Sequence, residues 1–298
     1  MSNLEISRAE RLDMRVVAML PELTRSAATH LIGQGKVTVN GMAVTKAGYK
    51  LKVGDKVYVA YEGPSDIPDV DLPILYEDED CVVVEKPIGL LTHSKGTFNP
   101  EPTVATWLGK HLANGPKANL DTEVAVGSPN NPRAGIVHRL DRATSGVIIC
   151  AKTPAALAWL QKQFAQRRTK KVYAAIVEGA LTPAEAIIDM PIERNPKAPA
   201  TFRVGANGKS AITHYRILET TEKYSLVELK PETGRTHQLR VHLAERGHPI
   251  VGDTFYKGRQ ADRLYLHALS LELTLPNRKR KVFTTELPAE FSQKMKES

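Results

Sequence analysis

The residues best suited to chemistry in this sequence form the nonapeptide His-Arg-Leu-Asp-Arg-Ala-Thr-Ser-Gly at positions 138–146. Its acid, Asp141, stands between two arginines. Short apolar runs flank the nonapeptide at 135–137 and 147–151, so we predict a loop between two buried strands. A carboxylate between guanidinium groups in such a loop is typical of a binding or catalytic site, because the strands hold the loop while its side chains stay accessible.

The same loop has a plainer interpretation, an Asx-type turn in which the Asp141 side chain bonds to nearby backbone. Loop aspartates commonly do this, and composition alone favours the turn. In the functional interpretation, the small residues Thr144, Ser145 and Gly146 let backbone approach a ligand closely. Other parts of the sequence therefore have to decide between the two.

Metal and thiol chemistry find little support in the sequence. Cys81 and Cys150 each lie within an apolar, strand-like run, which predicts reduced, buried thiols. The nine histidines are scattered, without paired cysteines or an H-E-x-x-H spacing. We expect no metal and no cofactor.

The charge of the chain favours a polyanionic partner. The formal net charge is +8, although residues 57–85 contain acids and no lysine or arginine. Basic clusters at 167–171 and 278–281 are suited to a phosphate backbone, but short charge runs are also common on solvated surfaces. Charge alone does not distinguish RNA from DNA or a membrane.

No apolar run approaches the roughly 20 residues of a membrane span, and the first residues do not resemble a signal peptide, so we expect a cytoplasmic protein.

The elements that must position the nonapeptide belong to the larger of two predicted domains. In the smaller, 1–62, apolar residues recur at helical spacing in 11–20 and 26–34. Residues 36–44 alternate around an Asn-Gly turn, and 49–59 add a Gly-Asp turn and a strand. This core is too small for an enzyme.

The larger domain is predicted at 74–298, after a linker at 63–73 that is rich in proline and acid and should hold the domains apart. Residues 113–133 are predicted to be a flexible loop leading to the site. Several strands follow one another without a helix between them, which indicates an α+β domain with a mixed, mostly antiparallel central sheet flanked by helices and loops. Beside the runs around the nonapeptide, strands are predicted at 81–86, 171–178, 211–218, 225–230 and 266–275, and helices at 104–112, 155–166, 236–246 and 289–296.

Four segments of the larger domain occur in the order of a known family. They read KPIGLLTH from 86, HRLDRATSG from 138, RTKKVYAAIVEG from 168 and KPETGRTHQLRVHL from 230, and Gly252-Asp253 and Leu266-His267-Ala268 complete the set. In these segments the chain resembles the RluA/RluD family of RNA pseudouridine synthases. The resemblance implies the pseudouridine synthase fold and the isomerisation of uridine in RNA, without a redox change.

The resemblance also implies roles for single residues. Asp141 would be the catalytic carboxylate, and its chemical role stays open between attack on the sugar, addition to the base and removal of a sugar proton. Arg240 would pair with Asp141 and favour its ionised form, because a planar guanidinium suits a bidentate grip on a carboxylate. Tyr173 would hold the detached uracil against its ring, and Arg139 would fill the gap that the flipped-out nucleotide leaves.

Further residues carry weaker expectations. Without the resemblance, Arg240 is a solvated helix residue, Tyr173 is sheet packing and Arg139 is a plain phosphate contact. Lys86 and Lys230 are candidates for RNA contacts. His138, His237 and His242 are expected to be structural, and Thr236 to cap a helix. The chain departs from the family at 256–258, which interrupts a usual glycine pair, and at 275–276, where His-Pro is common.

The smaller domain resembles RNA-binding domains of the ribosomal-protein-S-four type, in the runs RLDMRVVAML, TRSAATHLIGQGKVTVNG and KLKVGDKV. The resemblance implies that Arg25 and Lys36 face RNA, with Lys46, Lys50 and Lys52 as further phosphate contacts. The alternative is that these cations only keep a small domain in solution.

We therefore expect a monomeric RNA-modifying enzyme without a membrane partner. Large-subunit ribosomal RNA is the favoured substrate, and transfer RNA is the alternative. A non-catalytic RNA-binding ribosome-assembly factor and a nucleoside or glycoside hydrolase are the other classes. A glycosidase normally uses two carboxylates, and no second acid accompanies Asp141 in its motif.

Overall fold

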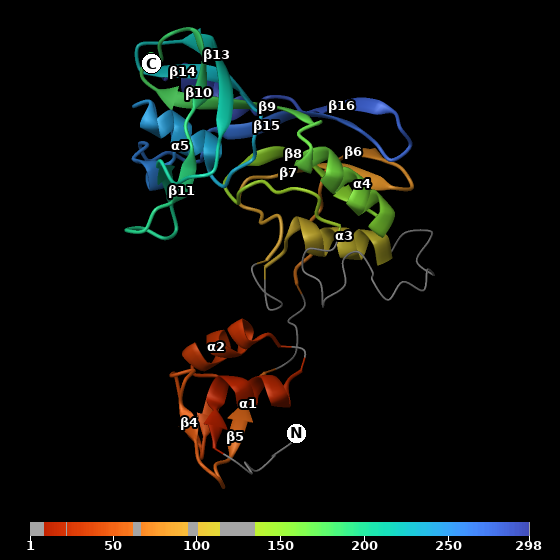
Figure 1. Ribbon diagram of the computed structural model, residues 1–298, viewed down its shortest axis with the longest axis vertical. Coiled ribbons are helices and arrows are strands. Elements are labelled where there is room, and N and C mark those ends of the chain that lie inside the picture. Colours follow the sequence, from red (N-terminus) through yellow and green to blue (C-terminus); the bar gives the residue numbers. More distant parts are fainter. Residues whose placement is uncertain (1–8, 22, 62–66, 95–100, 114–134, 298) are drawn as a thin grey trace. The chain divides into compact units, whose positions relative to one another are not determined.

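The computed structural model describes residues 9–21, 23–61, 67–94, 101–113 and 135–297 (Figure 1). The chain forms two compact units. The first comprises Met1–Val70 and His93–Ala134, and the second comprises Asp71–Thr92 and Gly135–Ser298.

The first unit has a small α+β core. Helices α1 (Leu12–Met19) and α2 (Arg25–Gly33) pack against each other, and Thr24 caps α2 by accepting a hydrogen bond from the Ala27 amide. Strands β2 (Val37–Val39), β3 (Met42–Ala43) and β5 (Val57–Val59) form one sheet, and β1 (Glu10–Arg11) pairs with β4 (Lys50–Leu51). The helices and the hairpin predicted for this region are confirmed. Helix α3 (Val104–Ala113) also belongs to the first unit.

The Asn-Gly turn between β2 and β3 has the predicted backbone. Asn40 and Gly41 both have positive φ, 52° and 82°. Two such residues in succession are what a two-residue hairpin turn of the primed type requires. The pair therefore fixes the register of β2 against β3.

The second unit is built on a nine-stranded sheet of order β10-β13-β14-β9-β15-β8-β7-β6, with β16 paired to β15 (Figure 1). Among these pairs only β8 with β15 is parallel, so the predicted mixed, mostly antiparallel sheet is confirmed. A separate hairpin joins β11 (Ile192–Arg194) and β12 (Phe202–Val204). The sheet strands are β6 (Ile74–Glu77), β7 (Cys81–Lys86), β8 (Ser145–Ala151), β9 (Lys170–Glu178), β10 (Glu185–Asp189), β13 (Ile212–Thr220), β14 (Tyr224–Pro231), β15 (Leu266–Thr274) and β16 (Arg280–Thr284).

Three helices and a short 3-10 turn complete the second unit. Helix α4 (Pro154–Ala165) contacts β8 and β15, α5 (Gln238–Glu245) contacts β12 and the 3-10 turn (Thr254–Tyr256), and α6 (Ala289–Met295) contacts β14. Helix α4 begins with Thr153 as its cap and proline in its first turn, both favourable at a helix start. Its apolar face is buried against Val83, Ile149 and Leu271 in one hydrophobic cluster.

Several sequence predictions need correction. The strand predicted at 135–137 is wrong, because this run makes only the isolated bridge from Ile136 to Cys150. Thr236 does not cap α5; the cap position is His237, without a capping side chain. The strands β6, β10, β11, β12 and β16 were not predicted, because each has only three to five residues, too few for a clear alternating pattern. The predicted loop at 113–133 and part of the predicted linker lie outside the described residues.

Candidate active site

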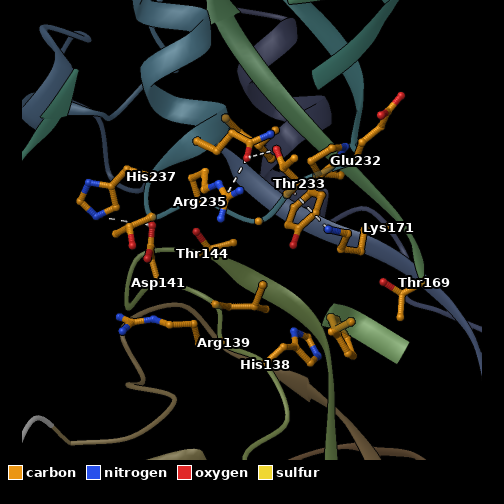
Figure 2. A pocket seen from close by; sticks show the side chains of 18 of the residues that line it. His138, Arg139, Asp141, Thr144, Thr169, Lys171, Glu232, Thr233, Arg235 and His237 are labelled. Atoms are coloured by element: carbon orange, nitrogen blue, oxygen red, sulfur yellow. Dashed lines mark hydrogen bonds and ion pairs between the residues drawn. The ribbon is translucent and has the colours of Figure 1, made fainter. Parts of the chain in front are cut away.

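A cavity of about 500 Å³ in the second unit brings the distant motifs together (Figure 2). Its wall comes from the nonapeptide loop, the end of α4, strand β9, and the segment that leads from β14 into α5. Four of the residues singled out from the sequence line it: Arg139, Asp141, Tyr173 and Arg240. Asp141 is 20% exposed and lies beside His237 (Figure 2).

The loop that carries Asp141 is held from below by two buried side chains. Lys86 donates hydrogen bonds to the carbonyls of Leu90 at 2.8 Å and Arg142 at 3.3 Å. Thr92 donates its hydroxyl to the Leu140 carbonyl at 2.8 Å and accepts the Leu140 amide. The backbone on both sides of Asp141 is therefore fixed by hydrogen bonds, and these bonds hold the loop that carries the carboxylate.

The end of the nonapeptide is held by direct contact with β15. Gly146 has a φ of 115°, and a Cβ there would lie 2.2 Å from the Ala268 carbonyl oxygen. Ser145 bonds to His267 Nδ1 at 2.8 Å. The close approach that Ser145 and Gly146 permit is therefore to a neighbouring strand and not to a ligand, which corrects that expectation; Thr144 does line the cavity.

The guanidinium of Arg240 joins two carboxylates. It donates from Nε and Nη2 to the two oxygens of Asp253, each at 2.7 Å, and Nη1 lies 3.5 Å from Asp141 Oδ2. The bidentate grip expected on Asp141 is therefore made on Asp253. Burial lowers the pKa of Arg240, but the hydrogen bonds and charge of Asp253 outweigh burial and raise it overall. Asp253 thus fixes a charged guanidinium that reaches the cavity with its remaining nitrogen.

His237 is the second side chain close to the Asp141 carboxylate. Its Nε2 lies 3.6 Å from Asp141 Oδ2, and its Nδ1 lies 2.7 Å from the Tyr256 hydroxyl, which also accepts the Phe202 amide. Its φ of 56° is left-handed, a strained conformation that the surrounding bonds must maintain. Burial lowers the pKa of His237, and the charge of Asp141 opposes that shift. The expectation that His237 is structural missed its place in the cavity.

Tyr173, Lys171 and His138 also line the cavity. Burial, and then the charge of Asp141, raise the pKa of the Tyr173 hydroxyl, so this phenol stays protonated. Burial and the neighbouring Arg167 lower the pKa of Lys171 to about 8. His138 accepts the Ile149 amide and stacks on Phe164 with centroids 4.5 Å apart, and burial lowers its pKa to about 3. His138 is therefore neutral and shapes the loop.

Two of the lysines proposed to contact RNA lie outside the cavity lining. Lys86 is fully buried, so a direct RNA contact is excluded for it in this structure, and it braces the loop instead. Lys230 is exposed on β14 and pairs with Glu228 at 2.7 Å. In the first unit, Lys36 is exposed, and Arg25 bonds to Asp13 while 57% of its side chain stays exposed.

Sequence reasoning missed Asp253, His237, Tyr256 and Lys171 as parts of one site. Asp253 and Arg240 are thirteen residues apart, and no local pattern connects them. Lys257, where the chain departs from the usual glycine pair, has a φ of 67°, a conformation that glycine adopts without strain.

Among the described residues, no group of three or more metal-ligating side chains is close enough to hold a metal ion, and no helix is long and apolar enough to span a membrane.

Comparison with known proteins identifies relatives over most of the chain. Residues 80–245 match the family model for RNA pseudouridylate synthase, and residues 10–57 match that for the S4 domain. An uncharacterized RNA pseudouridine synthase of Aquifex aeolicus is 40% identical over 253 residues, which cover 83% of this chain and 77% of that protein. The ribosomal large subunit pseudouridine synthase D of Escherichia coli K12 is 37% identical over 290 residues, which cover 90% and 83%. The solved structure of human RNA Pseudouridylate Synthase Domain Containing 4 has a TM-score of 0.57 and 27% identity, and the match covers 74% of this chain and 90% of that one.

Proposed function

Because the chain belongs to the RNA pseudouridylate synthase family, we propose that it isomerises specific uridines of large-subunit ribosomal RNA, with Asp141 as the catalytic carboxylate. That it is an RNA pseudouridine synthase follows from the family. The ribosomal substrate is supported by the relatives named for the large ribosomal subunit. The role of Asp141 is supported by its position in the cavity.

The observation that carries the catalytic proposal is the environment of one carboxylate. Both close contacts of Asp141, to Arg240 and to His237, go to Oδ2. We therefore assign Oδ1, which has no hydrogen bond to another side chain among the described residues, to the substrate. In the reaction the bond between ribose and N1 of uracil breaks, the base turns, and a bond to C5 forms; C5 loses a proton and N1 gains one. A fixed carboxylate beside the sugar is the group this sequence needs.

The detached base must stay in place between the two bond changes. We assign this role to Tyr173, whose protonated phenol lines the same cavity as Asp141 and offers a flat apolar surface with one hydrogen-bond donor. Arg139 is exposed at the cavity edge, where its guanidinium is suited to the space that a flipped-out nucleotide leaves in the RNA stack.

Hydrolysis is the less favoured chemistry for this cavity. A second carboxylate, Glu232, does line it, but Glu232 is bonded to His214 at 2.6 Å and is about half exposed. An acid so placed is paired at the rim, whereas a glycosidase needs two carboxylates flanking the scissile bond. The isomerase proposal requires that no free uracil be released.

The first unit supports RNA as the substrate. Its match to the S4 domain and the exposed cations Arg25 and Lys36 suit contacts to phosphates. The cytoplasmic location and the monomeric state expected from the sequence remain predictions.

The test is to delete the gene and map pseudouridines in ribosomal and transfer RNA by carbodiimide labelling and reverse transcription. Sites lost from large-subunit ribosomal RNA should return with the wild-type gene and with Asp189→Asn, a matched change of an exposed acid on β10, but not with Asp141→Asn. Full restoration by Asp141→Asn refutes the catalytic assignment. Loss of sites only from transfer RNA refutes the substrate, and loss of none favours an assembly factor.

A further inference from the structure

Two basic clusters that are far apart in the sequence meet on the second unit. In the sheet Lys170 of β9 is opposite Glu272 of β15, and Thr274 of β15 is opposite Arg280 of β16. The guanidinium of Arg280 donates to the Arg168 carbonyl at 3.3 Å from two of its nitrogens. Strand pairing therefore merges the clusters at 167–171 and 278–281 into one surface.

This surface is continuous with the catalytic cavity. Arg167 and Lys171 line the cavity, and the adjacent Arg168 lines a separate hollow of about 360 Å³ together with Trp159, Arg278 and Arg280. Cations thus continue from the cavity past the end of α4 to the turn between β15 and β16.

At the far end of this surface, the guanidinium of Arg278 lies over the Trp159 ring. Its guanidinium carbon lies 4.1 Å from the centroid of the Trp159 ring, and the indole of Trp159 donates to the Thr274 carbonyl at 2.9 Å. The turn is fixed by the hydrogen bond from the Arg278 amide to Leu275 and by a left-handed φ of 66° at Arg278. A guanidinium supported on an indole in this way presents its other face to a ligand.

We propose that these cations, Arg167, Arg168, Lys170, Arg278, Lys279 and Arg280, form a basic track that binds the RNA strand leading away from the target nucleotide. Its phosphates pair with the track, and one unstacked base covers the guanidinium of Arg278. This inference rests on the proposed function, because it needs an RNA nucleotide in the cavity.

Charge and pairing favour this role over that of a solvated surface. Glu272 neutralises part of the track, since it pairs with Arg280 at 2.6 Å and with Lys170 at 3.5 Å. The guanidinium groups of Arg167 and Arg168 have no acceptor among the residues that the structure describes. Unpaired guanidinium groups beside a nucleotide-sized cavity match the spaced charges of a single RNA strand, and their planes suit stacking on bases.

The test compares two double variants of the full-length protein. Arg168→Gln with Arg278→Gln removes two track cations, and Lys223→Gln with Arg246→Gln removes two exposed cations beside α6 and at the end of α5. The Kd for a transcribed large-subunit ribosomal RNA fragment is measured from 50 to 300 mM KCl. We expect the track variant to raise Kd about five- to tenfold near 100 mM salt and to reduce the slope of log Kd against log salt by about 1.5, while the control changes neither.

A third variant, Arg278→Lys, separates stacking from charge. Lysine keeps the positive charge but has no planar surface, so we expect a wild-type salt slope with Kd raised about threefold. Equal behaviour of the track and control variants overturns the track, and a wild-type Kd for Arg278→Lys overturns the stacked base. Weaker binding to ribosomal particles with unchanged binding to free RNA overturns the proposal in favour of a protein partner. Binding needs no turnover, so failure of the proposed function is read separately, from whether the wild-type protein converts uridine.

Discussion

Each unit contains a buried aspartate that forms ion pairs with arginine. The two ion-pair clusters differ in how far their arginines are exposed. In the first unit, Asp13 is 2% exposed and bonds to Arg11 and Arg25, at 2.9 Å in each case. In the second, Asp253 is 1% exposed and bonds to Arg240 at 2.7 Å. The acids are alike in burial and in geometry.

The arginines differ. Arg11 and Arg25 are 49% and 57% exposed, whereas Arg240 is 8% exposed. Asp13 therefore holds two cations at the surface, where water screens them and phosphates can reach them. Asp253 holds one cation inside a cavity, where its charge acts on a neighbouring group with little screening. Under the proposed function, the exposure of the cation, and not the ion pair itself, distinguishes the RNA-binding surface from the reaction site.

The largest expected effect tests the buried cluster directly. Arg240→Ala should reduce single-turnover conversion of uridine by about 10³-fold, because it removes a fixed positive group beside Asp141. RNA affinity should change by less than threefold, since the buried guanidinium is not at the surface. Conversion in a quench assay and Kd by filter binding check this; a Kd that rises as steeply as conversion falls contradicts the comparison.

The next effect concerns the residue that positions this guanidinium. Asp253→Asn removes the charge that fixes Arg240, and a misdirected guanidinium should lower conversion by about 10²-fold. The melting temperature should fall as well, because Arg240 keeps its charge in a buried place without its main partner. Conversion per folded molecule, with folding measured by circular dichroism, isolates the positioning effect. Wild-type conversion by the folded fraction would remove Asp253 from the site.

The matching change in the first unit should act on binding and stability. Asp13→Asn should weaken RNA binding several-fold, destabilise this unit by about 2 kcal/mol and leave conversion at saturating RNA near wild type. The hydrogen bond from Arg11 lowers the pKa of Asp13 well below its ordinary value, so its contribution to stability is fully present above the unfolded pKa of about 4 and is lost progressively as pH falls through the much lower folded-state pKa. Thermal melts from pH 3 to 7 test the sign: the difference between wild type and variant should be constant above about pH 5 and should begin to narrow toward pH 3.

The smallest expected effect is a pH dependence of RNA affinity that Lys171, a partly buried lysine, should cause and that arginines, which stay charged, should not. The pKa of Lys171 is lowered to about 8, so this cavity cation loses its charge between pH 7 and 9. RNA affinity should fall about twofold over that range in the wild type and should stay constant in Lys171→Arg, whose guanidinium remains charged. An identical pH profile for the two proteins would show that Lys171 does not contact the RNA.

Much of the fold was predictable because its elements carry local patterns. The helices at 12–19 and 154–165 and the strands at 81–86 and 224–231 combine apolar periodicity with caps or turns, and they form close to their predicted bounds. The strands β10 and β16 were not predicted, because each buries only one side chain and depends on its partner strand.

The candidate site was predictable in part: the elements that carry its residues follow from the sequence, but the contacts between those residues do not. The loop of Asp141 and the strand of Tyr173 follow from sequence, because a motif and an alternating pattern mark them. The burial of Lys86 under that loop, and the nearness of His237 to Asp141, do not follow.

The sequence by itself determined which residue types exist for chemistry and on which elements they lie: one acid in a loop, a tyrosine on a strand and an arginine on a helix. The tertiary structure alone decided their partners. It gave the bidentate grip of Arg240 to Asp253, removed Lys86 from the surface and brought two distant basic clusters together on one surface. The physical reason is range: helix and strand periodicity act over a few residues, whereas ion pairing and desolvation depend on distances in space that only the packed fold sets.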